Sequence, residues 1–219
     1  MDLKIKRKNE ALKQKEKKKE EVILAALEVF KEKGIENTKM SDISTNAEVG
    51  IASLYRYFKT KPELVICAAI KNWESVINTF YEDFNKDAYK SQNGIKSLAT
   101  ILDVFLNLYR DNKNFLRFIE EFDNYVIKEK ISQEDLEIYE KNILNLMPLM
   151  IEALEKGKKD KSIKLNINNE EFYMTLTHSL MSLCQKLISR NTILNSDKYI
   201  EGEVQVKLII KMAIEYVKN

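Results

Sequence analysis

The sequence predicts an all-α protein of about nine helices, in which an N-terminal three-helix domain precedes a larger helical body. Its 219 residues include only five Gly and two Pro, so turn-forming residues are scarce. Lys, Glu, Leu and Ile are abundant, and apolar residues recur at spacings of three and four, the period of one helical face. These observations predict long helices joined by short loops.

The first amphipathic helix is predicted over Glu21–Lys33. Gly34 follows two lysines, the usual pattern of a glycine after the last helical turn and cations within it. Thr38 can then cap the next helix. The core face of the first helix is predicted to consist of Ile23, Ala26, Leu27 and Phe30.

Residues 40–58 predict a helix, a tight turn and a second helix. Met40–Ala47 has one apolar face, Glu48–Gly50 interrupts it, and Ile51–Phe58 forms the second helix. Small side chains permit close approach to base edges, and tyrosine or arginine can bond phosphates or bases, so this helix suits a DNA major groove. Its predicted inward face is Ile51, Leu54 and Phe58. Its other faces carry Ala52, Ser53, Tyr55, Arg56 and Tyr57.

From about Ile23 to Cys67 the chain resembles the DNA-binding domain of the TetR (tetracycline-repressor-like) family. The most specific part is the run L-Y-R-Y-F-K-T-K at residues 54–61, followed by Glu-Leu at 63–64. The chain departs from the family at Glu48, where Gly is frequent, and at Gly50, where Ser or Thr is frequent. Gly is an acceptable helix cap, and Glu48 need only accept a turn conformation. Other matching residues are Ala26, Phe30, Gly34, Thr38 and Ile43.

The resemblance implies phosphate contacts from Tyr55, Tyr57 and Lys61. Thr38 and Ser41 lie near the N-terminus of the second helix and can also bond phosphates, helped by the helix dipole. The family pattern further implies a homodimer whose two recognition helices enter successive major grooves of palindromic double-stranded DNA.

Candidates for base-edge contacts are Ala52, Ser53 and Arg56, with Gly50 at the start of the recognition helix. The charge distribution agrees with this placement. Residues 1–66 have a net charge of +4 and the remainder −2, so the basic part coincides with the helix-turn-helix.

The predicted domains are a basic extension over residues 1–20, a DNA-binding domain over 21–66 and a ligand-binding and dimerisation domain over 67–219. The extension holds nine Lys or Arg against four Asp or Glu and has no apolar face, so we expect it to be frayed or disordered away from DNA. It is either an arm that adds phosphate or minor-groove contacts, or a solubilising tail.

The C-terminal body is predicted to contain six helices. Thr60 and Glu63 form a capping box for the first of them, which runs to about Asp87. Pro148 is expected to kink the helix that contains it and that closes before Gly157. The later helices are predicted over Ile95–Arg110, Asn112–Lys130, Ser132–Lys156, Glu170–Arg190 and about Gly202 to Lys218, with Asn168 and Glu171 capping the penultimate one.

Aromatic residues of the central helices can line a cavity for an apolar or aromatic small-molecule effector, because ligand pockets are mostly apolar with a few polar groups. The alternative is that they form ordinary core, which aromatic residues at helical spacing usually do. His178 is a ligand contact, an interface group or a core histidine. The predicted ligand-binding residues are Trp73, Phe80, Phe84, Phe105, Tyr109, Phe118, Phe122, Tyr125 and His178.

The last helix predicts homodimerisation. Its lysines cluster on one side and apolar residues occupy nearly all the rest, so more than one side needs cover. A second copy across a two-fold axis supplies that cover most simply, and two helices from each subunit would form a four-helix bundle. Burial inside a monomer is the alternative. The predicted interface is Leu176, Leu180, Leu183, Leu187, Leu208 and Met212.

The sequence contains no recognisable catalytic constellation or metal motif, and we expect neither enzymatic activity nor a cofactor. It has a single histidine and no Gly-rich nucleotide-binding motif. Cys67 and Cys184 are expected to be buried thiols. The charged N-terminus and the lack of an 18-residue apolar run predict a cytoplasmic protein without a membrane segment.

The predicted function is a dimeric, sequence-specific transcriptional regulator, a repressor that a ligand bound among the C-terminal helices releases from DNA. One alternative is an activator or a repressor that needs its ligand for DNA binding. Another is an all-α ligand-binding or enzymatic protein whose N-terminal helices serve other contacts. The basic N-terminal part and the absence of catalytic groups argue against this last class.

Overall fold

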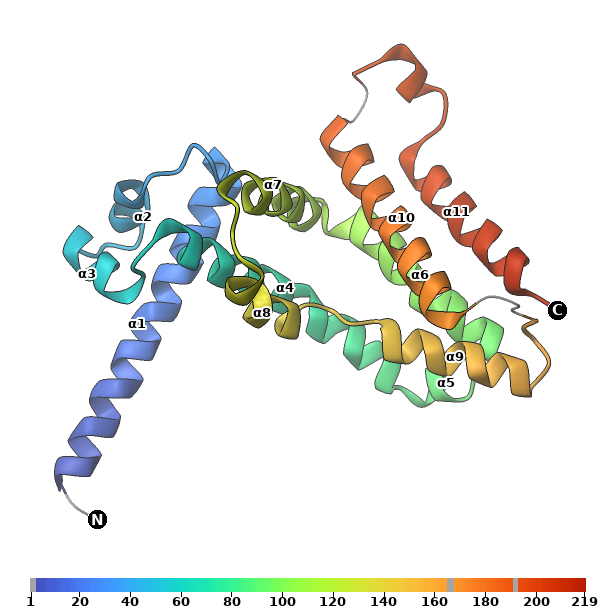
Figure 1. The fold of residues 1–219 in the computed structure, drawn as a ribbon, viewed down its shortest axis with the longest axis horizontal. Helices are drawn as coiled ribbons and strands as arrows, with labels where there is room; N and C mark the ends of the chain where they lie inside the picture. The colour runs from blue at the N-terminus through green and yellow to red at the C-terminus, as the bar shows by residue number, and fades with distance from the viewer. Residues whose placement is uncertain (1–2, 165–167, 191–192) are drawn as a thin grey trace. The chain divides into compact units, whose positions relative to one another are not determined.

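The computed structural model describes residues 3–164, 168–190 and 193–219, and within these ranges the chain forms helices and no strand (Figure 1). Two more helices are present than the sequence predicts. The elements are α1 (Leu3–Lys33), α2 (Met40–Asn46), α3 (Ile51–Tyr57), α4 (Lys61–Asn85), α5 (Asp87–Lys90), α6 (Gly94–Asp111), α7 (Lys113–Glu129), α8 (Gln133–Asn142), α9 (Met147–Lys159), α10 (Asn169–Arg190), the 3-10 helix η1 (Asn195–Lys198) and α11 (Gly202–Val217).

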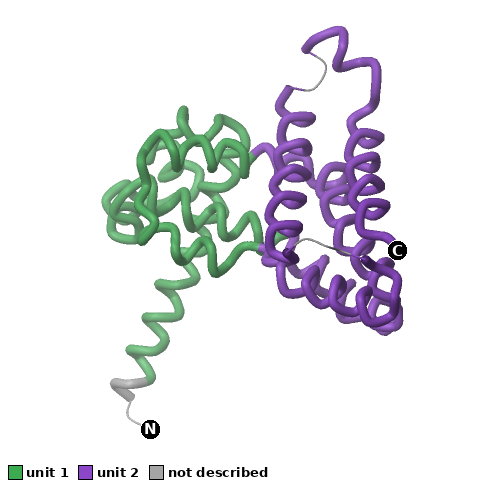
Figure 2. The backbone as a smooth tube through the Cα atoms, turned by 45° about the vertical axis from the view of Figure 1, so that its right-hand side comes forward, with its two compact units in different colours: residues 1–75, 118–143 green, residues 76–117, 144–219 purple. Residues whose placement is uncertain are grey.

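The chain forms two compact units (Figure 2). Unit 1 contains the chain up to Ser75 together with Phe118–Ile143, and unit 2 contains Val76–Arg117 and Leu144–Asn219. The helices α4 and α7 therefore each contribute residues to both units. The prediction of a boundary near residue 66 did not place residues 118–143 with the helix-turn-helix.

Unit 1 is built on the three-helix core that the sequence predicts. Phe30, Ile43, Leu54 and Phe58 are fully buried, and α2 packs on both α1 and α3. The second half of α7 completes this core. The Phe30 and Phe118 rings lie 6.5 Å apart between centroids, and the Ile35 N–H donates to a Glu121 carboxylate oxygen at 3.0 Å.

Unit 2 is a bundle of α6, α9, α10 and α11. The backbones of α6 and α9 meet at Gly94 and Gly157, where a Cβ on Gly94 would lie 2.1 Å from the Gly157 Cα. Cys184 is fully buried and its thiol donates to the Phe105 carbonyl, whereas Cys67 in unit 1 is half-buried. The inner face of α11 consists of the buried residues Val206, Ile210, Ala213 and Val217.

The structure corrects two predicted helices. The first helix starts at Leu3 rather than Glu21, so the expected frayed extension is helical where it is described. The helix predicted over 132–156 is two helices, and Pro148 lies in the first turn of α9, where a missing N–H costs no hydrogen bond, instead of kinking a longer helix. Helix α9 also continues past Gly157 and ends at Lys159.

The starts of α4, α6 and α10 are capped by side chains. The Thr60 hydroxyl accepts from the Glu63 N–H at 3.2 Å, as a capping box requires. The Glu63 carboxylate accepts from the backbone N–H of Lys59, whereas a capping box would use the N–H of Thr60. Asn93 and Asn168 cap α6 and α10. Residues 1–2 of the predicted extension and 165–167 of the loop before α10 lie outside the described residues.

Candidate nucleic-acid interface

The start of α2 is set by Asp42. Its carboxylate accepts from the Lys39 backbone N–H at 2.8 Å and pairs with the Lys33 ammonium at 3.2 Å, and these contacts hold the pKa of Asp42 below its ordinary value. Lys39 is thus the N-cap residue, not Thr38 as predicted. The first turn of α2 leaves Ser41 exposed, in the position predicted for a phosphate contact.

The turn between α2 and α3 is held by short polar contacts. The Ser44 hydroxyl donates to the Val49 carbonyl at 2.6 Å, and the Val49 N–H returns a bond to the Ser44 carbonyl at 3.1 Å. Glu48 has a φ of 50°, in the left-handed region that favours glycine. The expectation that Glu48 accepts a turn conformation is confirmed, at the cost of some backbone strain.

Helix α3 is fixed from one side and open on the other. Leu54 and Phe58 are completely buried, and α3 packs on α2. The open side presents a row of small, aromatic and cationic groups. Its exposed members are Gly50, Ala52, Tyr55 and Arg56, with Ser53 and Tyr57 half-buried.

The cations of this surface are arranged within reach of aromatic rings. Arg56 donates to the Ser53 hydroxyl at 3.3 Å, and its guanidinium lies 5.8 Å from the centre of the Tyr57 ring. Stacking of this kind limits the conformations that a long cation samples before it meets a partner.

Lys61 is less free than the sequence suggests. Its ammonium donates to the Glu36 carbonyl at 3.2 Å and lies 5.4 Å from the centre of the Tyr125 ring, and burial lowers the pKa of Lys61. A phosphate contact from Lys61 stays a prediction. In this structure the Lys61 ammonium is directed toward the Glu36 carbonyl.

Thr38, a residue of the predicted interface, and Ile51, a predicted core residue, both differ from expectation. Thr38 is 2% exposed and its hydroxyl donates to the Gly34 carbonyl, so it does not present that group to a phosphate here. Ile51, predicted to face inward, is 45% exposed. It is the first residue of α3, where the helix has not yet reached the core, and its apolar side chain adds to the open side of that helix.

The predicted ligand-binding residues are divided between the units. Unit 1 contains Trp73, Phe118, Phe122 and Tyr125, whereas unit 2 contains Phe80, Phe84, Phe105, Tyr109 and His178. In unit 1 the Trp73 indole donates to the Tyr139 hydroxyl at 2.8 Å, and the Phe122 and Tyr139 rings lie 4.5 Å apart. Burial raises the pKa of Tyr139 and, to about 12, that of Tyr125.

The unit 2 members of this set are mostly core residues. Phe80, Phe84 and Phe105 are buried, and the Tyr109 hydroxyl lies beside Gly202. His178 is exposed on α10. Two surface hollows of about 470 and 560 Å³ lie in unit 1 beside α1 and α4. Both are lined by Lys19 and Cys67, and none of the nine predicted residues lines either of them.

The predicted dimer interface contains residues of two kinds. Leu176 and Leu180 are buried within unit 2 and therefore join α10 to its own bundle, whereas Leu183 and Leu187 are half-buried. Leu208 and Met212, by contrast, are more than half exposed. They continue a row of exposed apolar residues at every fourth position, which we call the outer stripe of α11: Val204, Leu208, Met212 and Tyr216.

The described ranges hold neither a metal-binding cluster nor a membrane-spanning helix. No group of three or more His, Cys, Asp or Glu side chains there is placed to hold a metal ion. In the same part of the chain, no helix has the length and apolarity required to cross a membrane.

Residues 22–67 match the family model of bacterial regulatory proteins of the tetR family, which confirms the resemblance seen in the sequence. The chain is also 34% identical over 101 residues to an HTH-type transcriptional regulator of Staphylococcus aureus, a match that covers 45% of this chain and 51% of that protein. A second such regulator from the same species is 32% identical over 99 residues, with the same coverage. The chain thus spans about half the length of the curated relatives it matches.

Solved structures resemble the chain over nearly its whole length. A TetR transcription regulator from Haloarcula marismortui has a TM-score of 0.70 at 12% identity and covers 93% of this chain and 100% of its own. The regulator FadR from Bacillus subtilis, solved in complex with stearoyl-CoA, has a TM-score of 0.56 at 17% identity, with coverages of 89% and 96%. At these identities the similarity shows the fold alone.

Proposed function

Because residues 22–67 match the family model of bacterial regulatory proteins of the tetR family, we propose that the chain is a dimeric, sequence-specific DNA-binding transcriptional regulator. Its role in this proposal is that of a cytoplasmic repressor, which a small-molecule effector releases from a palindromic operator. A regulatory family also agrees with the expectation of a non-enzymatic chain.

The observation that carries the DNA-binding proposal is the two-sided character of α3. Leu54 and Phe58 are fully buried, while Ala52, Tyr55 and Arg56 point away from the core. A rigidly seated helix with small, hydroxyl-bearing and cationic groups on its free side has the features required to read a major groove. Exposed Ser41 at the start of α2 supports a neighbouring phosphate contact.

The outer stripe of α11 supports dimerisation. The inner face of this helix already packs on α6 and α10, so the exposed apolar row on another face has no cover within unit 2. A second copy related by a two-fold axis would cover it with the same residues from the other subunit. The half-buried Leu183 and Leu187 of α10 would join that interface as predicted.

Effector control is proposed to act through α4. This helix starts with Lys61 immediately after the DNA-reading elements and ends with Asn85 in unit 2. A ligand that shifts one end of such a continuous helix changes the spacing of two recognition helices in a dimer, for which a coupling of about 1–3 kcal/mol is enough. The nine residues predicted from the sequence remain the candidate effector contacts, and the bound stearoyl-CoA of one FadR structure supports a long apolar effector.

The test is a selection from the protein's own genome. Purified protein is mixed with sheared genomic DNA at two salt concentrations, and the retained fragments are sequenced. Enrichment of a palindromic site that survives the higher salt is expected. Binding that is only sequence-independent and salt-sensitive, with or without acyl-CoA, would overturn the proposal, because phosphate contacts alone give no sequence preference.

A further inference from the structure

The N-terminal part of α1 is an exposed cationic helix that the helix-turn-helix does not require. Every residue from 6 to 18 is exposed, and α1 extends without interruption from Leu3 into the core segment (Figure 2). Such an extension buries no apolar surface of its own, so its sequence is free to serve another contact.

The charges of this extension are sorted by face. At 100° per residue, Arg7, Lys8, Lys15, Lys18 and Lys19 fall within an arc of about 120°, and no Asp or Glu of residues 6–21 falls within it. We call these five residues the cationic face. The carboxylates Glu10, Glu16, Glu20 and Glu21 lie outside the arc.

The cationic face continues the buried side of the same helix. Val22, Ala26 and Val29, which are buried in unit 1, fall within the same arc further along α1. One side of the helix thus changes from apolar, where it meets the core, to cationic, where it leaves it. A cationic surface in that position is not suited to packing on this chain and is suited to a polyanion.

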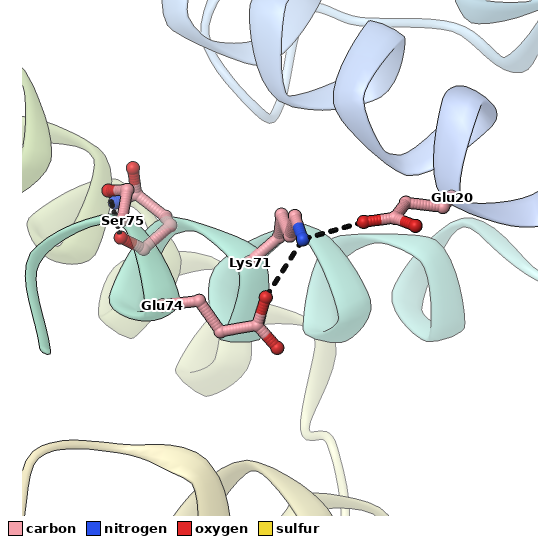
Figure 3. A network of polar contacts seen from close by, with 5 residues as sticks. Glu20, Lys71, Glu74 and Ser75 are labelled. Atoms are coloured by element: carbon pink, nitrogen blue, oxygen red, sulfur yellow. Dashed lines mark hydrogen bonds and ion pairs between the residues drawn. The ribbon is translucent and has the colours of Figure 1, made fainter. Parts of the chain in front are cut away.

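The base of the extension is held in a defined orientation. The Lys71 ammonium of α4 bonds Glu20 of α1 at 2.8 Å and Glu74 at 2.9 Å (Figure 3). These contacts raise the pKa of Lys71 and keep Glu20 turned toward α4. The Glu20 carboxylate is therefore directed toward α4, away from the cationic face, whereas Glu21 pairs with Lys18 of that face.

The cationic face begins beside the end of the recognition helix. The Lys19 ammonium lies 5.2 Å from the centre of the Phe58 ring, directly after α3. Lys18 pairs with Glu21 at 2.6 Å, which raises the pKa of Lys18, and the charge of Glu48 in the turn that precedes α3 acts in the same direction. DNA that contacts Tyr57 would thus have the cationic face as its next neighbour in unit 1.

We propose that the cationic face of the α1 extension binds the phosphate backbone of the DNA that flanks each half-site. This inference rests on the proposed function and adds a second contact region to it. From Leu3 to Lys18 the helix spans about 24 Å, at 1.5 Å per residue. That length is comparable to about seven base pairs, since each strand advances by about 3.4 Å per base pair.

The test compares two triple variants with the same change in charge. Arg7→Gln, Lys8→Gln and Lys15→Gln remove cations from the cationic face. The control, Lys6→Gln, Lys13→Gln and Lys17→Gln, removes three cations that lie on the opposite side of the same exposed helix. Each protein is titrated with the selected operator, both trimmed to its half-sites and extended by about ten base pairs on each side, over a range of salt concentrations.

The wild-type protein is expected to bind the extended duplex more tightly than the trimmed one. The cationic-face variant should bind both duplexes with similar affinity, and its salt slope on the extended duplex should fall by about 0.9 for each phosphate that it no longer neutralises. The control variant should keep the preference for the extended duplex.

Three results would overturn the inference. One is an equal weakening of binding in both variants, which would mean that only net charge matters. Another is a wild-type protein that binds both duplexes equally. The third is loss of binding to anionic phospholipid vesicles in the cationic-face variant with unchanged DNA binding, which would assign the face to a membrane surface. Failure to select any operator with the wild-type protein would instead refute the proposed function.

Discussion

At the scale of single residues, Glu48 departs both from the tetR-family pattern that residues 22–67 match and from ordinary backbone geometry. A φ of 50° at a residue with a Cβ costs about 1–2 kcal/mol, and Gly avoids that cost while adding freedom to the unfolded chain. We therefore expect Glu48→Gly to raise the free energy of unfolding by about 0.5–1 kcal/mol, measured by urea denaturation.

The matched control for this prediction is Glu48→Ala. It removes the carboxylate but retains a Cβ at the same positive φ, so it should give no comparable gain in stability. If Glu48→Ala stabilised the protein as much as Glu48→Gly, the charge of Glu48 and not its backbone strain would be responsible.

Arg56 and Lys61 are expected to contribute differently to DNA binding. Arg56 is exposed on α3, so Arg56→Ala should cost about 1–3 kcal/mol on the selected site and reduce the preference for it. Lys61→Ala should weaken binding to all sequences alike and lower the salt slope by about 1. Titrations of the operator and of a scrambled duplex measure both effects, and an unchanged salt slope in Lys61→Ala would exclude its phosphate contact.

At the scale of elements, the backbones of α6 and α9 meet closely at Gly94 and Gly157. A Cβ on Gly94 would meet the Gly157 backbone at 2.1 Å, and backbone cannot move aside as a flexible side chain can. Gly94→Ala is expected to destabilise unit 2 by about 1–3 kcal/mol or more. Gly50→Ala, where no atom lies within 4 Å of the added Cβ, serves as the control. Thermal unfolding followed by circular dichroism should rank the two variants in that order, and equal stability would contradict the contact.

Element boundaries show what periodicity predicts well. Helices α2, α3 and α10 begin and end within about one residue of their predicted bounds. Short-range spacing and capping groups define these bounds. The division between α8 and α9 was missed, because residues 143–146 are mostly apolar and continue the helical pattern through a segment that is not helical. Pro148 was the available signal, since proline is favoured at the start of a helix.

At the scale of the whole molecule, the outer stripe of α11 predicts the oligomeric state. Leu208→Glu places a charge in the middle of the proposed interface and should give a monomer with poor operator binding. Ile127→Glu is the control, because Ile127 is 75% exposed on α7 and lies outside the stripe. Light scattering with size-exclusion chromatography measures the mass, and a Leu208→Glu protein that stays dimeric would refute this interface.

Binding of a long apolar effector is expected to change both the thermal stability and the operator affinity of the whole molecule. A ligand present at 100 times its Kd stabilises the folded state by about 2.7 kcal/mol, which for a chain of this size raises the Tm by about 5–10 °C. Stearoyl-CoA should produce such a shift and lower operator affinity, whereas coenzyme A alone should do neither. A shift without loss of DNA binding would indicate an activator or a co-repressor-dependent regulator, and no shift would exclude this class of effector.

The sequence by itself determined the helical class of the protein, the helix-turn-helix and the residues that form α3. These features depend on local spacing and turn chemistry, which a single chain segment contains in full. Only the tertiary structure decided that Thr38 is buried, that Ile51 is exposed and that residues 118–143 complete the core around Phe30. Periodicity in the sequence reveals that a helix has an apolar face that must be buried. It does not identify the distant segment that covers this face, and burial depends on that segment.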